Sequence, residues 1–242
     1  MSTKTFFILA SLLCSNNLLP APTFQPDDFT KRLETATDFC TKTSLFLQLL
    51  ADAQAQKCSN ELDTLQFAID HVTIQGAYLE MGVFNGRTIN FLSRLRPHVT
   101  IHGFDSFEGL PEDWIRQDTT DYTKGKFALK TLPSVGPNIQ LYKGWFDATL
   151  PIFKEKNLRQ QPIAFMHIDC DLYSSTKTIF EVLGDNIVEG TILSFDELYN
   201  YPGFENHEMK AFLEFLNDKN LSAEFLAYNV NHEQVVVKII KK

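Results

Sequence analysis

The sequence predicts an α/β fold built on a mostly parallel sheet. Short apolar runs, which are typical of buried strands, alternate along the chain with segments of helical spacing, as they do in βαβ units. Four of the predicted strands end in acid, although only 30 of the 242 residues are acidic. Ligands of open α/β sheets bind beyond the carboxyl ends of the strands, so we expect these acids to line a binding site.

A chain of 242 residues with 44% hydrophobic content can bury the core of one large domain. We assign residues 61–242 to this domain and residues 1–60 to an N-terminal helical arm or cap that is part of it. Mixed helical spacing between residues 27 and 56 predicts one or two extra helices, and a further helix is expected over about 60–71.

The remaining elements follow in alternation. Strands are predicted at 77–81, 100–105, 139–143, 162–169 and 191–196. Helices are predicted at 87–95, 175–183 and 207–218. Two more strand-like runs, 223–228 and 234–240, lie so close together that they predict an antiparallel hairpin at the edge of the sheet.

The charge and cysteine content exclude several classes of partner. A net charge of −8 would repel a phosphate backbone, so we do not expect nucleic acid to bind. The four cysteines include no CxxC pair, and we interpret them as reduced thiols of a cytoplasmic protein. No run approaches the ~20 apolar residues of a membrane span. A homo-oligomer is compatible with the sequence, which does not specify the oligomeric state.

The N-terminus leaves a second location open. Lys4 and the apolar run 6–14 partly resemble a secretory signal, but the run is short and no clear small-residue cleavage site follows it. We expect an apolar N-terminal helix or arm that covers the domain, with export as the alternative.

Residues Glu80–Thr88, EMGVFNGRT, form a strand end and a glycine-containing turn that opens a helix. Glycine lets the backbone approach a ligand closely, and a helix N-terminus offers free N–H groups to an anionic group. The G-x-G-x-x-G spacing of a dinucleotide site is absent. A tight turn without a ligand remains an alternative interpretation.

Asp105 ends the next predicted strand within GFDSFEGLP. An acid in this position can accept hydrogen bonds from the two hydroxyls of a ribose, so together with the first turn it indicates an adenosine-containing ligand without a diphosphate. The alternative is that Asp105 or Ser106 merely caps the following turn.

Asp169, Asp171, Asp196 and Glu197 follow two successive strands. Like charges held close together favour a neutralising cation, and oxygen ligands without Cys favour Mg²⁺, with Mn²⁺ or Ca²⁺ as alternatives. His167 lies on the same side of its strand as Asp169, and we interpret it as a packed histidine rather than a ligand or base.

Aromatic residues follow two other strands. Gly144, Trp145 and Phe146 could lie beside a purine, or Trp145 and Phe146 could belong to the core. The residues after the fifth strand could line an acceptor pocket or pack within their loop: Tyr199, Tyr201, Phe204 and His207.

At these motifs the chain resembles the macrocin O-methyltransferase family of class I S-adenosylmethionine-dependent methyltransferases, through GVFNGRT, GFDSFEGLPEDW, GWFDATLP, HIDCDLYSST and FDE in this order. The resemblance covers roughly residues 76–215. It implies a Rossmann-like, seven-stranded sheet with helices on both faces, and Mg²⁺-dependent methyl transfer to a hydroxyl of a small molecule, such as a sugar on a natural product.

The resemblance also implies site residues. Expected cofactor-binding residues are Glu80, Gly82, Val83, Phe84, Gly86, Arg87, Thr88, Asp105, Ser106, Phe107, Gly144, Trp145 and Asp169. The metal ligands implied are Asp169, Asp196 and Glu197, and Asp171 is the implied general base. Where the family usually carries Asp-Asp-Tyr this chain has Asp196-Glu197-Leu198, and Glu189-Gly190 replaces the usual Gly-Gly.

The resulting hypothesis is an O-methyltransferase in which the metal acidifies an acceptor hydroxyl and Asp171 removes its proton. Two alternatives are a noncatalytic nucleoside-binding domain of the same fold and a nicotinamide-dependent oxidoreductase. The missing G-x-G-x-x-G disfavours the oxidoreductase.

Overall fold

The computed structural model describes residues 24–117 and 122–242. The apolar run at 6–14, which carries the prediction of an arm or signal, lies outside these residues. In the described part of the chain, no helix is both long enough and apolar enough to cross a bilayer.

An eight-stranded sheet in the order β1-β7-β8-β6-β5-β2-β3-β4 forms the centre of the molecule. β8 pairs antiparallel with both β6 and β7, and all other neighbouring strands are parallel. The strands are β1 (Gln56–Cys58), β2 (Ala77–Met81), β3 (Ile101–Asp105), β4 (Ile139–Lys143), β5 (Ile163–Ile168), β6 (Ile192–Phe195), β7 (Leu221–Asn229) and β8 (Val235–Lys241).

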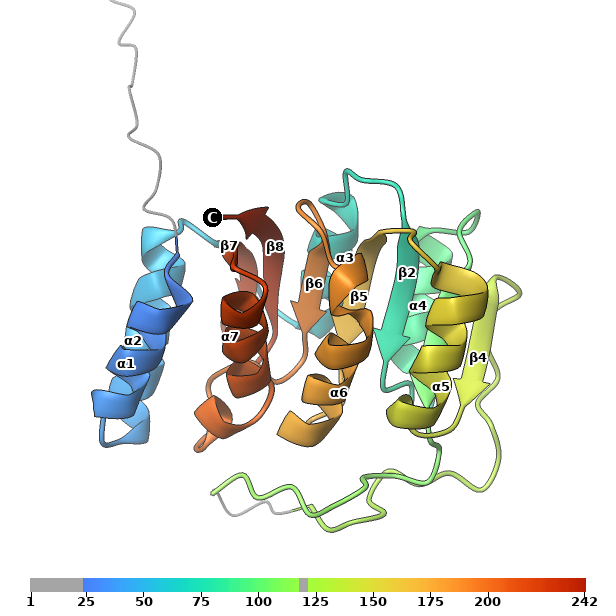
Figure 1. The fold of residues 1–242 in the computed structure, drawn as a ribbon. Helices are drawn as coiled ribbons and strands as arrows, with labels where there is room; N and C mark the ends of the chain where they lie inside the picture. The colour runs from blue at the N-terminus through green and yellow to red at the C-terminus, as the bar shows by residue number, and fades with distance from the viewer. Residues whose placement is uncertain (1–23, 118–121) are drawn as a thin grey trace, which may run out of the picture.

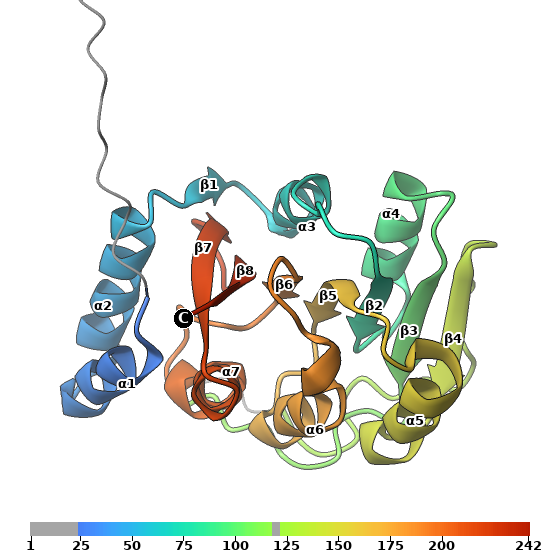
Figure 2. The ribbon, with the colours of Figure 1, turned by 45° about the horizontal axis from the view of Figure 1, so that its top comes forward.

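Helices cover both faces of this sheet (Figures 1 and 2). α5, α6 and α7 lie on one face, α3 and α4 lie on the other, and α1 and α2 lie beyond α7 near the β7 end. The helices are α1 (Pro26–Thr35), α2 (Phe39–Asp52), α3 (Glu61–Asp70), α4 (Arg87–Leu95), α5 (Phe146–Phe153), α6 (Tyr173–Leu183) and α7 (Glu208–Asp218).

This architecture confirms the predicted α/β fold, the mostly parallel sheet and the antiparallel C-terminal hairpin. Two details differ from the prediction. Gln56–Cys58 pairs with β7, so the sheet has eight strands rather than seven and the hairpin is not its outermost element. The sequence analysis also missed α5, because Pro151 lies inside it and proline disfavours a helix interior.

The chain order places a topological switch point between β2 and β5. From β2 the sheet grows through β3 and β4, and the chain then returns to add β5 and β6 on the other side of β2. The connection 106–138 runs beneath the carboxyl ends of these strands (Figure 1). Ligands of open α/β sheets bind at this position.

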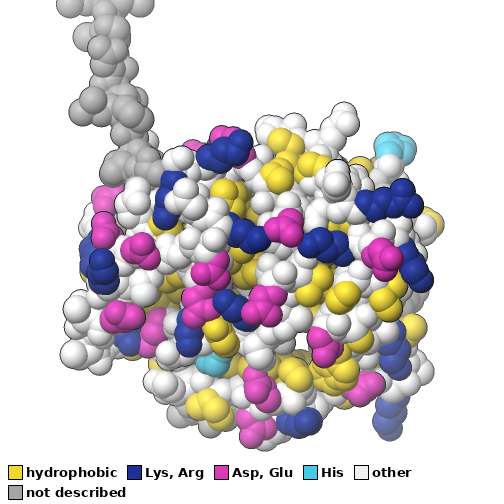
Figure 3. All heavy atoms as spheres, viewed as in Figure 1, with side chains coloured by type: hydrophobic (Ala, Val, Ile, Leu, Met, Phe, Trp, Pro, Cys, Tyr) yellow, Lys and Arg dark blue, Asp and Glu magenta, His cyan; other side chains and the backbone are white. Residues whose placement is uncertain are grey.

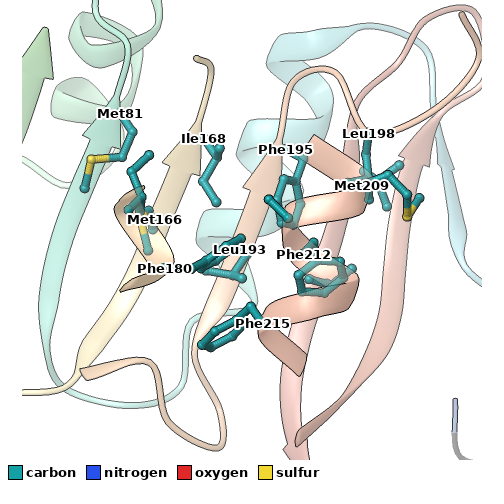
Figure 4. Packing of buried hydrophobic residues seen from close by; sticks show 14 of the residues in the cluster. Met81, Met166, Ile168, Phe180, Leu193, Phe195, Leu198, Met209, Phe212 and Phe215 are labelled. Carbon is teal, nitrogen blue, oxygen red and sulfur yellow. The ribbon is translucent and has the colours of Figure 1, made fainter. Parts of the chain in front are cut away.

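The main core lies between the sheet and the α5–α7 layer. Figure 4 shows Met166 and Leu193 of the sheet near Phe180 of α6 and near Phe212 and Phe215 of α7. The rings of Phe180 and Phe215 stack with their centroids 4.5 Å apart. Outside this layer, Lys and Arg lie beside Asp and Glu (Figure 3), and such exposed ion pairs add little stability. Apolar burial therefore dominates the stability of the fold.

The N-terminal helices contribute to the same apolar cluster. Phe46 of α2 is fully buried, and its ring centroid lies 5.1 Å from that of Tyr199 and 5.6 Å from that of Phe225. Ser222 also donates a hydrogen bond to the backbone oxygen of Phe24. Side chains of α2 thus contact the loop after β6 and the strand β7.

We expect Phe46→Ala to lower the free energy of unfolding by about 3–5 kcal/mol, because it removes a fully buried ring and leaves a cavity. Leu47→Ala on the same helix is the matched control, since Leu47 is 40% exposed, and it should cost less than about 0.5 kcal/mol. Urea denaturation measures both values. Equal effects would contradict the assignment of α2 to the core.

Candidate active site

A cavity of about 290 Å³ lies at the carboxyl ends of the strands and is also lined by residues of the connection 106–138. Its size is at the lower end of ligand pockets, which span roughly 300–1,000 Å³. The predicted site residues that line it are Gly82, Phe84, Asp105, Ser106, Gly144, Trp145, Asp169, Asp171 and Glu197. The structure therefore brings the glycine turn and part of the acidic set to one cavity.

The first wall of the cavity is the turn after β2. Gly82 has φ +92°, and a Cβ atom there would lie 1.6 Å from the carbonyl oxygen of Asp169. Only glycine fits this close approach of two backbones. Asp169 also donates its backbone N–H to the Met81 carbonyl, so the strand ends of β2 and β5 are fixed to each other.

Glu80 lies beneath this turn and is fully buried. Its carboxylate accepts a hydrogen bond from the Thr88 hydroxyl at 3.0 Å, and Nδ1 of His167 lies 3.2 Å from its other oxygen. Burial raises the pKa of Glu80, and the contacts with His167 and Thr88 oppose this rise. Glu80 and Thr88 thus anchor the start of α4 from below.

Asp105 fixes the backbone around the cavity. One carboxylate oxygen accepts hydrogen bonds from the N–H groups of Val83 and Phe84, both at 2.8 Å. The other oxygen accepts a bond from the N–H of Phe107 at 2.6 Å. Phe84 and Phe107 have positive φ angles of 44° and 56°, so Asp105 stabilises two unusual turns. A ribose bound here would share the Asp105 carboxylate with these N–H groups.

Three carboxylates meet on the opposite wall. Asp169, Asp171 and Glu197 each offer an oxygen, and these oxygens lie within 4.8 Å of one another. Burial, followed by the charge of Asp196, raises the pKa values of Asp169 and Glu197 well above their usual range. One oxygen of Glu197 is buried and has no hydrogen-bond partner among the described residues. A hard divalent cation would supply the missing partner and neutralise the cluster.

Asp196, the third predicted metal ligand, lies beside this cluster. It accepts a hydrogen bond from Gln234 at 3.1 Å, and its Oδ1 lies 3.9 Å from Nε2 of His167. Burial opposes its ionisation, but the contacts with His167, Glu197 and Gln234 hold its pKa below the usual value. Asp196 is therefore a fixed negative charge behind the cluster.

Asp171 has φ +67°, an unusual backbone angle for a residue other than glycine. Burial and the charge of Asp196 raise its pKa to about 7, although the nearby Arg116 opposes this rise. A carboxylate with this pKa is suited to general base chemistry near neutral pH. Backbone strain of this kind is often found at functional sites.

Residues of the connection 106–138 form an aromatic wall of the cavity that the sequence analysis did not identify. Trp114 and Tyr122 stack with their ring centroids 5.2 Å apart, and Phe127 lies next to Tyr122. Arg116 lies over the Trp114 ring and pairs with Glu233 in the turn before β8. This connection has no regular spacing that could have indicated its role.

The other predicted residues do not line the cavity. Val83, Gly86, Thr88 and Phe107 are not among the residues that line it, and Arg87 forms an ion pair with Glu61. Of the aromatic residues after β6, Tyr199, Tyr201 and Phe204 are buried in the core, and His207 contacts the backbone of Ile115. For the three core residues, the packing alternative is correct.

Glu208 is a further buried acid that the sequence analysis missed. Its two oxygens accept hydrogen bonds from the N–H groups of Cys170 and Glu197, at 3.4 and 3.3 Å. It therefore connects the turns that carry the acidic cluster. Its position in the first turn of α7 is that of an ordinary helix-start acid, so no sequence pattern indicated its contacts with the acidic cluster. Cys170 lies between Asp169 and Asp171 in the sequence, and its thiol is 3.4 Å from the Thr176 hydroxyl.

Comparison with known proteins agrees with this geometry. The family described as Macrocin-O-methyltransferase (TylF) matches residues 53–233. No curated protein matches the sequence.

Three solved structures, of the two proteins CalS11 and NovP, share the fold. A crystal structure of CalS11, a calicheamicin methyltransferase, is 22% identical, covers 88% of this chain and 90% of its own, and has a TM-score of 0.57. An apo structure of CalS11, described as a TDP-rhamnose 3'-O-methyltransferase, is 20% identical, covers 88% and 92%, and has a TM-score of 0.51. The O-methyltransferase NovP is 18% identical, covers 75% and 79%, and has a TM-score of 0.53.

We expect Gly82→Ala to destabilise the protein by more than about 3 kcal/mol, because strain from a positive φ adds to the clash with Asp169. Gly125→Ala is the matched control. Gly125 has a similar φ of +82°, but a Cβ there would meet no atom of residues 24–117 or 122–242 within 4 Å, so we expect a cost of about 1–2 kcal/mol. Chemical denaturation of both variants measures the difference, and equal costs would show that the contact between β2 and β5 is unimportant.

Proposed function

The chain belongs to the macrocin O-methyltransferase family, and from this premise we propose that it methylates a sugar hydroxyl in a reaction that requires Mg²⁺. Family membership makes it an S-adenosylmethionine-dependent O-methyltransferase. The sugar acceptor and the metal are the proposal. The observation that carries the proposal is the convergence of the glycine turn and three carboxylates on one cavity.

The donor side of the cavity is formed by the ends of β2, β3 and β4. In our proposal the backbone at Gly82 contacts the amino acid portion of the donor, near the start of α4. Asp105 binds the ribose hydroxyls, and Trp145 lies beside the adenine. The donor carries its methyl group on a positively charged sulfur, so the acidic wall also favours its binding electrostatically.

The cation side is formed by the ends of β5 and β6. We propose that Asp169 and Glu197 bind the cation from the cavity wall. Asp196, whose charge acts on Glu197, is the third proposed ligand. The residues fit a hard divalent cation because they offer oxygen ligands with an unsatisfied, buried acceptor atom. When bound, Mg²⁺ would supply Lewis-acid polarisation of an acceptor hydroxyl.

The protein's own part in catalysis is orientation and proton removal. Methyl transfer needs the acceptor oxygen in line with the methyl carbon and sulfur, so fixing two ligands in one cavity lowers the entropic cost of the reaction. Asp171 takes the hydroxyl proton onto its carboxylate. Trp114, Tyr122 and Phe127 line the cavity and reduce its contact with water.

The aromatic wall supports a sugar as the acceptor. Trp114, Tyr122 and Phe127 line the same cavity as the acidic wall. A sugar has apolar C–H faces that pack on such rings, while its neighbouring hydroxyls can reach Asp171 and the cation site. We propose a small-molecule acceptor and, given the net charge of −8, no nucleic acid partner.

The function is tested by methyl-transfer assays with S-adenosylmethionine against a panel of glycosides and catechol-like diols. We expect turnover of at least one glycoside, a fall of at least about tenfold with EDTA, and recovery with excess Mg²⁺. Turnover unchanged by EDTA would contradict the metal requirement. Turnover of diols alone would contradict the sugar acceptor.

The role of Asp171 predicts a selective defect. Asp171→Asn should lower kcat by about 10²–10⁴-fold, because the amide cannot accept the proton, and should leave donor affinity unchanged. Asp105→Ala should instead weaken donor binding, because it loosens the turns at Val83, Phe84 and Phe107.

Isothermal titration calorimetry with S-adenosylmethionine and steady-state kinetics separate these two defects. Asp218→Asn, an exposed substitution on α7, is the control and should behave as wild type. An Asp171→Asn protein with the wild-type kcat would refute the assignment of the base.

A further inference from the structure

His167 is a buried polar residue that the proposed reaction does not use. It lies within β5, opposite Glu80 of β2 in the register of the sheet, and is 1% exposed. The sequence suggested a packed core histidine. However, each of its ring nitrogens has a carboxylate beside it, which apolar packing does not require.

The Nδ1 side of His167 leads to the donor-binding turn. Nδ1 lies 3.2 Å from one oxygen of Glu80, and the other oxygen of Glu80 accepts a hydrogen bond from Thr88 at 3.0 Å. Glu80 and Thr88 are 0% and 5% exposed, so water does not replace these partners. Thr88 is the second residue of α4. The contacts on the Nδ1 side therefore end at the backbone proposed to contact the donor.

The Nε2 side leads to the acidic cluster. Nε2 lies 3.9 Å from Oδ1 of Asp196, which also accepts a hydrogen bond from Gln234 at 3.1 Å. Gln234 in turn accepts a bond from Asn229 at 2.6 Å. Asp196 precedes Glu197 directly and donates its backbone N–H to Ile168. The contacts on the Nε2 side therefore end at the proposed cation site.

We propose that His167 is a positioning residue that sets the donor-binding turn and the cation site relative to each other. It acts on Thr88 through Glu80, and on Glu197 through Asp196. An imidazole suits this task because it is rigid and carries two separate nitrogens, so one side chain fixes two carboxylates at a constant separation. This inference rests on the proposed function.

Two amide substitutions test the Nδ1 contact and the Nε2 contact separately. In His167→Asn the shorter amide reaches the place of Nδ1 and keeps the contact with Glu80. In His167→Gln the longer amide reaches the place of Nε2 and keeps the contact with Asp196. His167→Leu removes both contacts. The matched control is His102→Asn, because His102 is a histidine of β3 that contacts the Tyr142 hydroxyl and, within the described part of the chain, no carboxylate.

Isothermal titration calorimetry with S-adenosylmethionine and, separately, with Mg²⁺ measures the effects on the full-length protein. We expect His167→Asn to keep donor affinity and to lose about tenfold or more in Mg²⁺ affinity, as is typical when a partner behind a metal ligand is removed. His167→Gln should show the reverse pattern, and His167→Leu should lose both affinities. His102→Asn should bind both ligands as wild type does.

The crossed pattern distinguishes positioning from a general structural role, because a merely destabilised protein would lose both affinities together in every variant. Both amide variants binding both ligands normally, or both losing them equally, would overturn the inference. If the wild-type protein does not bind Mg²⁺, the metal part of the proposed function fails and the inference fails with it. Wild-type binding of both ligands without the crossed pattern refutes the positioning role alone.

Discussion

The contact between Gly82 and the carbonyl oxygen of Asp169 is the constraint on which the site depends. It exists because β2 and β5 are neighbours at the point where the chain order of the sheet reverses. No other residue can replace Gly82, since any Cβ at this position would overlap the backbone of Asp169. The turn that opens α4 and the carboxylates after β5 are therefore parts of one rigid edge.

The second constraint is electrostatic. The cluster at Asp169, Asp171 and Glu197 concentrates negative charge in a poorly solvated place, and the raised pKa values of these groups express the cost of ionising them. Asp196 differs because His167 and Gln234 stabilise its charge. The site is thus incomplete without positive charge, and both a sulfonium donor and a divalent cation would provide it. This complementarity explains why donor and cation would bind in one cavity.

Much of the fold and part of the site could be predicted from the sequence. The strands ending at Glu80, Asp105 and Asp196 are short apolar runs with a clear polar stop, which is a local signal. The strand pairing of Gln56–Cys58 could not be predicted, because three residues carry no periodicity and depend on β7 for partners. The contributions of Arg116 and Glu208 depend on tertiary contacts that span 117 and 38 residues of sequence, so no local pattern revealed them. Sequence spacing also could not show that Asp171 joins Asp169 and Glu197 in a group whose oxygens lie within 4.8 Å of one another.

The thiol of Cys170 has a practical consequence. Only a thiolate reacts readily with oxidants and alkylating reagents, and burial together with the charge of Glu208 raises the pKa of this thiol well above its usual value. Burial also raises the pKa of Cys58, whereas Cys40 is exposed on α2. Among the described residues, a maleimide dye would therefore attach at Cys40. The fluorophore would then report on the N-terminal helices while the chemistry at the sheet edge remains unmodified.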